Sequence, residues 1–400
     1  MNILSSNDIN ILDLPDEMLH AIFNNLSTVD ILYSLVDVDQ RFTRLALDPL
    51  VIRHLDFVIK QDDLHDSSVN TKILDRICSK ILPRINEKVE KLTVDQFSME
   101  RIIDVVDYSQ LHSLSLEKLI NLKCFSLRTN WYTSYYDEQV VPLLRRMLNL
   151  EELTLLLPVR RYKSTYIDGN HLYDQVLNYM PQLNKFIFNI HTEIIHLSTD
   201  IDVPSNDDIR NSFIKRGFQS VEACADKKSN NIICRCHVYS LPYQFDEFMF
   251  MGKCFQGGRF DKVRMLSMHD EHPFEHELFK IISQDFPFLQ KLSIWNFESP
   301  KKEQHYSSTL IIFNYLFELD LMLAHSDYAI QFLSDTKTRL LCLTNLRIEY
   351  ETLATVTNNF TNDATRLNCA KIKSLVMYRK FVPPHNFFSY FSSSVNVSFI

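Results

Sequence analysis

The stretch Leu289-Gln290-Lys291-Leu292-Ser293-Ile294 places apolar side chains at its first, fourth and sixth positions. Leu292 and Ile294 flank a single polar residue, and this alternation is typical of a β-strand with one buried face. The same spacing returns at Leu150-Glu151-Glu152-Leu153-Thr154-Leu155. A strand that recurs with the same lead-in indicates a repeated structural unit.

Short alternating cores of this kind recur along most of the chain. The last five begin at residues 266, 292, 319, 346 and 375, so they are 26, 27, 27 and 29 residues apart. The predicted strand cores are Leu92-Thr93-Val94, Leu114-Ser115-Leu116, Phe125-Ser126-Leu127, Leu153-Thr154-Leu155, Phe186-Ile187-Phe188, Leu266-Ser267-Met268, Leu292-Ser293-Ile294, Leu319-Asp320-Leu321, Leu346-Arg347-Ile348 and Leu375-Val376-Met377.

Helical patterns precede several cores, at residues 138–147, 171–180, 277–285 and 328–334. A helix-then-strand unit of this length with Leu-x-x-Leu-x-Leu resembles an irregular leucine-rich repeat. The resemblance implies an α/β solenoid with a parallel sheet on the concave side and helices on the convex side. An ordinary α/β domain is the alternative, which the constant spacing disfavours. The family's laddering asparagine stands only at Asn130 and loosely at Asn296.

The chain divides into three segments by pattern. We assign residues 11–55 to a short helical module, 56–84 to linker helices and 85–400 to the repeat domain. Residues 198–232 are polar and interrupt the rhythm, so we interpret them as an insertion before a strand at 236–241, with a helix start at Ser205. Insertions in solenoids lie in loops, often on a binding face, although a merely tolerated loop fits equally well.

Composition argues against several classes of function. A net charge of −8 disfavours nucleic-acid binding by phosphate neutralisation. Five glycines supply neither Gly-x-x-x-x-Gly-Lys nor Gly-x-Gly-x-x-Gly, so we expect no nucleotide and no other cofactor. No apolar run reaches the roughly 18 residues of a membrane span. Without a secretory signal we expect no membrane partner, a cytoplasmic and/or nuclear location, and free cysteines.

The N-terminal module begins with Asp13-Leu14-Pro15-Asp16-Glu17, in which proline and the acidic residues suit the first turn of a helix. Apolar residues then follow at positions 19, 22, 23 and 26, which is one stripe of an amphipathic helix. Ser27 and Asp30 have the spacing of a capping box, and a third helix is predicted around residues 39–46. Three helices this short form a poor core alone, so a cap on the repeat domain is one interpretation.

The order of these features resembles an F-box over about residues 11–52. F-box proteins bind the Skp-type adaptor of cullin-RING (SCF) ubiquitin ligases through this apolar face. Position by position, the resemblance implies an adaptor-binding set of Leu14, Pro15, Leu19, Ile22, Leu26, Ile31, Leu32 and Leu35. Two departures stand out: the family's Cys-Lys or Cys-Arg is replaced by Val38-Asp39-Gln40, and its Leu-Trp by Val51-Ile52.

Candidate contacts with a target protein follow from strand alternation, because the residue between paired apolar positions faces away from the core. Aromatic side chains after a strand are added because exposed aromatics anchor interfaces. The candidate target-binding residues are Arg128, Trp131, Tyr132, Trp295, Asp320, Arg347, Glu349 and Tyr378.

Two polar clusters offer metal-ligand chemistry. His269-Asp270-Glu271-His272-Pro273-Phe274-Glu275-His276 contains possible zinc ligands, but Pro273 prevents a helical His-Glu-x-x-His arrangement. Cys234-Arg235-Cys236 has a one-residue gap, shorter than structural zinc sites prefer. A polar loop and strand packing explain both, so we predict no metal and no catalytic residue.

The sequence therefore predicts a non-catalytic, target-recognising subunit of an SCF-type ubiquitin ligase. Its partners would be the Skp-type adaptor with its cullin complex, and an unknown protein substrate. One alternative is a leucine-rich-repeat scaffold that joins no ligase. A second, less favoured alternative is a metal-binding hydrolase built around the loop between His269 and His276.

Overall fold

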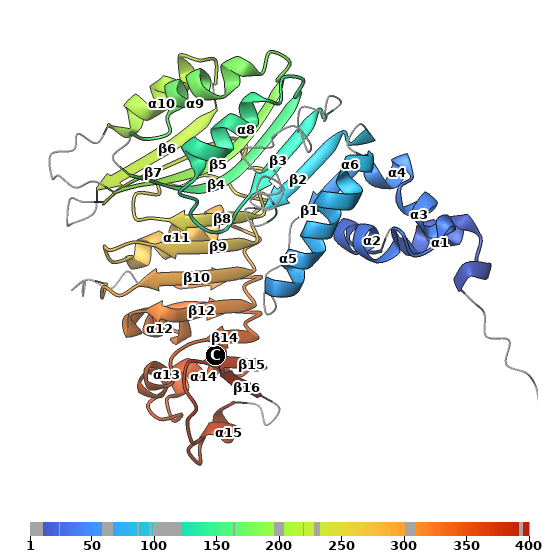
Figure 1. Ribbon diagram of the computed structural model, residues 1–400. Helices are drawn as coiled ribbons and strands as arrows, with labels where there is room; N and C mark the ends of the chain where they lie inside the picture. Colours follow the sequence, from blue (N-terminus) through green and yellow to red (C-terminus); the bar gives the residue numbers. More distant parts are fainter. Residues whose placement is uncertain are drawn as a thin grey trace, which may run out of the picture. The chain divides into compact units, whose positions relative to one another are not determined.

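The computed structural model describes residues 11–23, 25–57, 67–85, 88–95, 98, 122–162, 165–195, 204–218, 220–227, 233–300, 309–391 and 395–399. The chain forms two compact units, Met1–Ile195 with Asp208–Gln219, and His196–Asp207 with Ser220–Ile400. Both are mixed α/β and are built around parallel strands, which is consistent with a repeat solenoid (Figure 1).

Short helices occupy much of residues 11–52 in the first unit: η1 (Ile11–Asp13), α1 (Asp16–Phe23), α2 (Thr28–Leu35), α3 (Gln40–Ala46) and α4 (Pro49–Ile52). The predicted cap is confirmed, since Ser27 Oγ accepts the Asp30 N–H at 3.1 Å and begins α2. Asp39 begins α3 in the same way by accepting the N–H groups of Arg41 and Phe42. These helices therefore start at residues that satisfy their free N–H groups locally.

The sheet of the first unit contains the parallel strands β1 (His54–Phe57), β2 (Lys91–Asp95), β3 (Cys124–Arg128), β4 (Glu152–Tyr162) and β5 (Lys185–Ile195), in that order. Equivalent apolar residues pair across them, from Leu55 to Leu92, Phe125, Leu153 and Phe186. The sheet thus begins at His54, before the predicted start at residue 85. Its first strand was missed although Leu55-Asp56-Phe57 has the same alternation as the predicted cores.

Helical segments connect these strands. They are α5 (Ser67–Arg76), the π-helical turn η3 (Ile77–Ile81), α6 (Leu82–Ile85), the π-helical turn η6 (Tyr136–Val140), α8 (Val141–Arg145), α9 (Gly169–Gln175), η7 (Leu177–Tyr179) and α10 (Asn206–Ile214). Gly169 lets α9 approach α10 closely, because a Cβ atom there would lie 2.5 Å from the Phe213 nitrogen. The predicted helix start after Ser205 is confirmed by α10.

The second unit carries the regular part of the repeat. One parallel sheet in this unit contains seven strands: β8 (Glu247–Met251), β9 (Met265–His269), β10 (Lys291–Asn296), β12 (Glu318–Ala324), β14 (Asn345–Arg347), β15 (Ser374–Met377) and β16 (Asn396–Phe399). The leading leucines 266, 292, 319, 346 and 375 lie side by side in register. The spacing of 26–29 residues therefore corresponds to one strand per repeat, as the sequence predicted.

The connections between these strands contain the helices α11 (His276–Asp285), α12 (Ser326–Leu333), α13 (Tyr350–Val356), α14 (Asp363–Cys369) and α15 (Phe387–Tyr390) (Figure 1). They also contain a small parallel sheet of β11 (Ile311–Phe313) and β13 (Thr338–Leu340). Phe279 of α11 and Phe332 of α12 pack edge to face at 4.9 Å in the core. Asn296 is buried, and its Nδ2 donates to the His272 carbonyl at 2.6 Å, as a laddering asparagine does.

The predicted insertion contains regular structure. β6 (Val221–Lys227) pairs antiparallel with β7 (Ile233–Ser240). The strand predicted at 236–241 is thereby confirmed, and a second strand precedes it within the insertion. The remaining strand predictions match observed strands, except Leu114-Ser115-Leu116, which lies outside the described residues.

His237 on β7 gives the second unit a pH-dependent stability. Its ring is 6% exposed between Tyr239 and Phe248, and burial lowers the pKa of His237 to about 3. Its pKa is thus lower when folded than when unfolded, so this contribution is complete above about pH 6.5 and is lost as the pH falls toward 3. Between pH 7 and 5 we expect a loss of up to about 2 kcal/mol. His237→Phe should flatten that dependence in urea titrations, and an unchanged slope would contradict this.

Candidate functional site

A pocket of about 600 Å³ opens where strands of the second unit end. Five of the eight predicted target-binding residues line it: Trp295, Asp320, Arg347, Glu349 and Tyr378. Five further lining residues were not predicted: Met322, Leu323, Tyr350, Glu351 and Arg379. The missed residues lie one to three positions after predicted ones along the chain. Extending the prediction from Asp320 to the end of β12 would have found Met322 and Leu323, whereas Tyr350 and Glu351 lie in α13 and Arg379 follows β15.

The floor of the pocket is polar because the outward row of the sheet is polar. Register places Ser293, Asp320 and Arg347 side by side on β10, β12 and β14. Arg347 Nε lies 2.8 Å from Asp320 Oδ2, and Asp320 Oδ1 accepts the Met322 N–H at 3.0 Å. Burial raises the pKa of Asp320, and the Met322 N–H and Arg347 oppose that rise. The two charges therefore offset one another within the floor.

The rim of the pocket is aromatic and charged. Tyr378 is 64% exposed, and Tyr350 stacks on Phe381 with ring centroids 4.3 Å apart. Glu349 precedes α13 and makes no side-chain cap there. An exposed aromatic ring can stack on a polypeptide, and a nearby carboxylate that caps no helix can accept hydrogen bonds from it.

The other three predicted residues, Arg128, Trp131 and Tyr132, belong to the first unit, whereas the residues that line the pocket belong to the second. The hydroxyl of Tyr132 lies 3.0 Å from His191 Nδ1, and the Arg160 guanidinium covers the Tyr132 ring at 4.9 Å. Tyr132 is thus held inside a polar network. Trp131 is 61% exposed and remains the better candidate for an interface anchor.

The predicted adaptor-binding residues separate into two groups by burial. Pro15, Ile22 and Leu26 are exposed, and Leu14 and Leu35 are half-buried. The others, Leu19, Ile31 and Leu32, are buried in the packing of the helices. A partner therefore has direct access only to the exposed and half-buried residues. The three buried residues hold together the helices that carry the exposed ones.

Two exposed apolar residues of the same module were not predicted. Met18 lies one turn before Ile22 on α1, so the two share a face, and Val38 is exposed between α2 and α3. The predicted stripe at positions 19, 22, 23 and 26 contains both buried and exposed residues and omits Met18. Met18 is recognised only once the exposed side of α1 is known.

Asp16 fixes the helices of this module to one another. Its carboxylate accepts from Arg41 Nε at 2.8 Å and Arg44 Nη2 at 2.6 Å, and Arg41 Nη2 also donates to the Leu14 carbonyl at 2.6 Å. The hydrogen bonds of Arg44 and then Arg41 lower the pKa of Asp16. Residues 14–16 are therefore held against α3.

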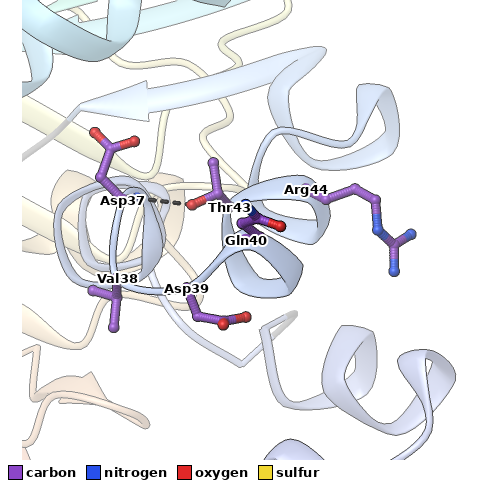
Figure 2. A pocket seen from close by; sticks show the side chains of 6 residues that line it. All are labelled: Asp37, Val38, Asp39, Gln40, Thr43 and Arg44. Atoms are coloured by element: carbon purple, nitrogen blue, oxygen red, sulfur yellow. Dashed lines mark hydrogen bonds between the residues drawn. The ribbon is translucent and has the colours of Figure 1, made fainter.

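The loop between α2 and α3 lines a shallow hollow, formed by Asp37, Val38, Asp39, Gln40, Thr43 and Arg44 (Figure 2). The Asp37 N–H donates to Thr43 Oγ1 at 2.8 Å, and Asp37 has a positive φ of 66°. This is the loop where the sequence departs from the F-box pattern. Its conformation is set by Asp37 and Thr43 rather than by the family's cysteine.

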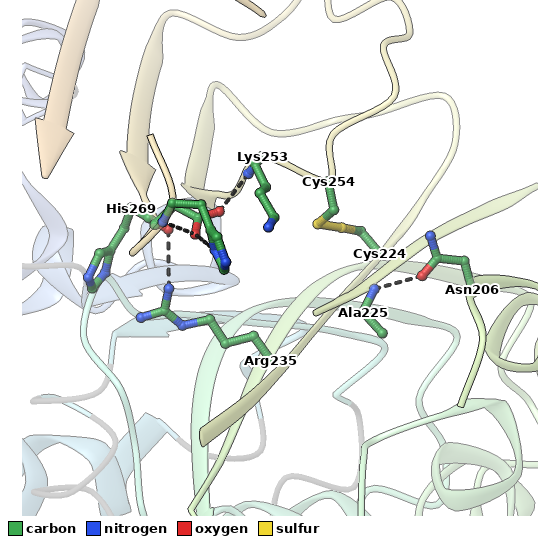
Figure 3. The surroundings of a disulfide bond; sticks show 9 residues. Asn206, Cys224, Ala225, Arg235, Lys253, Cys254 and His269 are labelled. Atoms are coloured by element: carbon green, nitrogen blue, oxygen red, sulfur yellow. Dashed lines mark hydrogen bonds and ion pairs between the residues drawn. A yellow bond between two sulfur atoms is a disulfide. The ribbon is translucent and has the colours of Figure 1, made fainter. Parts of the chain in front are cut away.

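The two polar clusters of the second unit have structural partners. His276 is hydrogen-bonded through both ring nitrogens, to Gln331 Oε1 and the Thr309 carbonyl. Cys234 and Cys236 are buried free thiols, whereas Cys224 and Cys254 form a disulfide (Figure 3). The expectation that all cysteines are free is therefore wrong for this pair, whose separation of 30 residues hid it from sequence reasoning.

Comparison with known proteins gives little. No protein-family model matches this sequence, and no curated protein matches it. Among solved structures it is similar to one described as the crystal structure of the Rad7 and Elc1 complex in yeast, at 10% identity and a TM-score of 0.32. The likeness covers 95% of this chain and 89% of that chain. A likeness at this TM-score carries no argument about fold or function.

Among the described residues, no helix combines the length and the apolar character that crossing a membrane requires.

Proposed function

We propose that this chain is a target-recognition subunit of an SCF-type ubiquitin ligase, with residues 11–55 acting as an F-box. The observation that supports this best is the placement of the F-box positions. Pro15, Ile22 and Leu26 are exposed apolar residues around α1, while their neighbours in the pattern form the core that presents them. Ile22 lies on α1, Pro15 directly precedes it and Leu26 follows it, and an exposed apolar group of this kind suits a protein partner.

The mechanism is bridging without chemistry on this chain. The Skp-type adaptor would hold the N-terminal module and thereby the cullin complex, while the pocket around Asp320 and Arg347 holds a target protein. When one chain holds both the cullin complex and the target protein, the effective concentration of the target near the ubiquitin-transfer machinery is high. The reaction would take place in the cytoplasm or the nucleus, and no cofactor takes part.

The direct test is complex formation between the purified full chain and a recombinant Skp-type adaptor. We expect the two to co-elute as a one-to-one complex in size-exclusion chromatography. Absence of any complex at micromolar concentrations would overturn the ligase proposal and would favour a leucine-rich-repeat scaffold that joins no ligase.

The pocket of the second unit is tested by removing two of its aromatic residues. Trp295→Ala with Tyr378→Ala is expected to lower target capture at least about tenfold, because exposed aromatic anchors contribute about 2 kcal/mol each when they are hot spots. Proximity labelling in proteasome-inhibited cells should show proteins enriched on the natural chain and depleted on this variant. Phe297→Ala with Tyr315→Ala removes two exposed aromatics that do not line the pocket and is the control. Equal depletion by both variants would contradict the assignment.

A further inference from the structure

Three potential metal ligands converge in the second unit from segments far apart in sequence. One ligand atom from each of Asp226, Asp270 and His272 lies within 4.8 Å of the other two. Asp226 belongs to β6, in the segment predicted to be an insertion, whereas Asp270 and His272 follow β9. Sequence reasoning considered the loop after β9 alone and therefore lacked the third ligand.

The loop that carries two of the ligands is held in place before any ion binds. Asp270 is 8% exposed, its Oδ2 accepts the Lys253 N–H at 2.7 Å, and its Oδ1 accepts the His272 N–H at 2.9 Å. The carbonyl of His272 in turn accepts from Asn296 Nδ2 at 2.6 Å. His272 Nδ1 also lies 3.2 Å from Asp270 Oδ1, so two of the three ligand side chains already contact each other. Partners of this kind orient ligands in metal sites.

The donor set decides which ion would fit. Two carboxylates and one imidazole combine oxygen with nitrogen, and an imidazole favours zinc and its neighbours over magnesium or calcium. Ligand atoms around a tetrahedral zinc lie about 3.4 Å apart, given bonds of about 2.1 Å. The three atoms here need to approach by about 1.4 Å at most, which side-chain rotation at the half-buried Asp226 and His272 can supply.

Charge also favours a cation at this position. Two carboxylates within 4.8 Å of each other repel, and Asp270 is shielded from water. Arg235 lies opposite Asp226 in the register of β6 and β7, and its Nη1 donates to the His269 carbonyl at 3.2 Å (Figure 3). A divalent ion would offset both carboxylates at once.

We propose that Asp226, Asp270 and His272 bind one Zn²⁺ ion, which fastens β6 to the loop after β9. The Cys224–Cys254 disulfide already joins β6 to the segment after β8, two residues from Asp226 (Figure 3). The ion would thus be a second cross-link to β6, and water would complete the coordination of the ion. This site is independent of the proposed ligase function.

The test is Zn²⁺ binding by the full-length, metal-free chain, measured by competition with a chromophoric chelator and without thiol reductant. We expect one equivalent to bind, and Asp226→Asn or His272→Gln to weaken binding at least about tenfold. Glu271→Gln, which removes a charge from the same loop but no ligand, should bind as the natural chain does. Co²⁺ in place of Zn²⁺ should give visible bands without thiolate-to-metal charge transfer.

A second measurement separates loss of the ion from loss of the fold. Zn²⁺ should raise the melting temperature of the natural chain and of Glu271→Gln, but not that of His272→Gln. Absence of stoichiometric binding would overturn the proposal. So would thiolate charge transfer in the Co²⁺ spectrum, or unchanged affinity in both ligand variants.

Discussion

Substituting Ile22 and Leu26 with aspartate is expected to abolish binding of the Skp-type adaptor while leaving the fold intact. Both side chains are substantially exposed, at 39% and 42%, so charge there meets water in the free chain. In the complex each side chain would be buried against the partner and would contribute about 1.5–3 kcal/mol. Loss of both predicts an affinity at least about 100-fold weaker, which titration calorimetry with purified adaptor can measure.

The matched control is a double aspartate variant elsewhere in the same unit. Leu148 and Ile214 are exposed to a similar degree and lie outside the N-terminal module, so Leu148→Asp with Ile214→Asp should bind the adaptor normally. Equal weakening by both variants would mean that the effect is not specific to α1. Leu19→Asp would be a poor test, because Leu19 is fully buried and the variant would unfold its helices.

Asn368→Ala is expected to destabilise the second unit by about 3–5 kcal/mol. Asn368 is 1% exposed, and its Nδ2 donates to the carbonyls of Phe332, Leu333 and Thr338, while its Oδ1 accepts the Leu340 N–H. Alanine leaves these backbone groups without their partner in a site closed to water. Urea unfolding, with hydrogen exchange followed at the Leu340 amide, measures the loss.

Leu367→Ala provides the control on the same helix, since Leu367 is 49% exposed and its loss should change stability by less than about 0.5 kcal/mol. A change of under 1 kcal/mol for Asn368→Ala would show that water or neighbouring groups replace its hydrogen bonds.

The repeat was predictable because its information is local. Leu292 and Leu319 are separated by one repeat in sequence, and each lies in a strand whose alternation is complete within three residues. The polar pocket floor was predictable for the same reason, since Asp320 and Arg347 are the middle residues of such cores. Strand β8, with its register shift, lacks that alternation and was missed. β1 does alternate, at Leu55-Asp56-Phe57, but lies outside the regular spacing of the later cores.

The candidate sites that depend on contacts between residues far apart in sequence could not be predicted from local patterns. Nothing near Asp226 in sequence indicates that it lies beside Asp270 and His272, and Cys224 gives no sign of its partner. Periodicity marked the amphipathic stripe of α1 but could not tell which part of it the other helices cover. The burial of Leu19 and the exposure of Ile22 depend on where α2 and α3 pack.

The two arginines on Asp16 have a consequence for how the N-terminal module would meet a partner. Because Arg41 and Arg44 already hold residues 14–16 against α3, the start of α1 has little freedom left to lose on association. Binding then carries a smaller entropic penalty than it would for a helix that orders on contact. Under the proposed function, adaptor affinity would then also depend on Asp16, Arg41 and Arg44, and their effect would be seen in the entropy of binding.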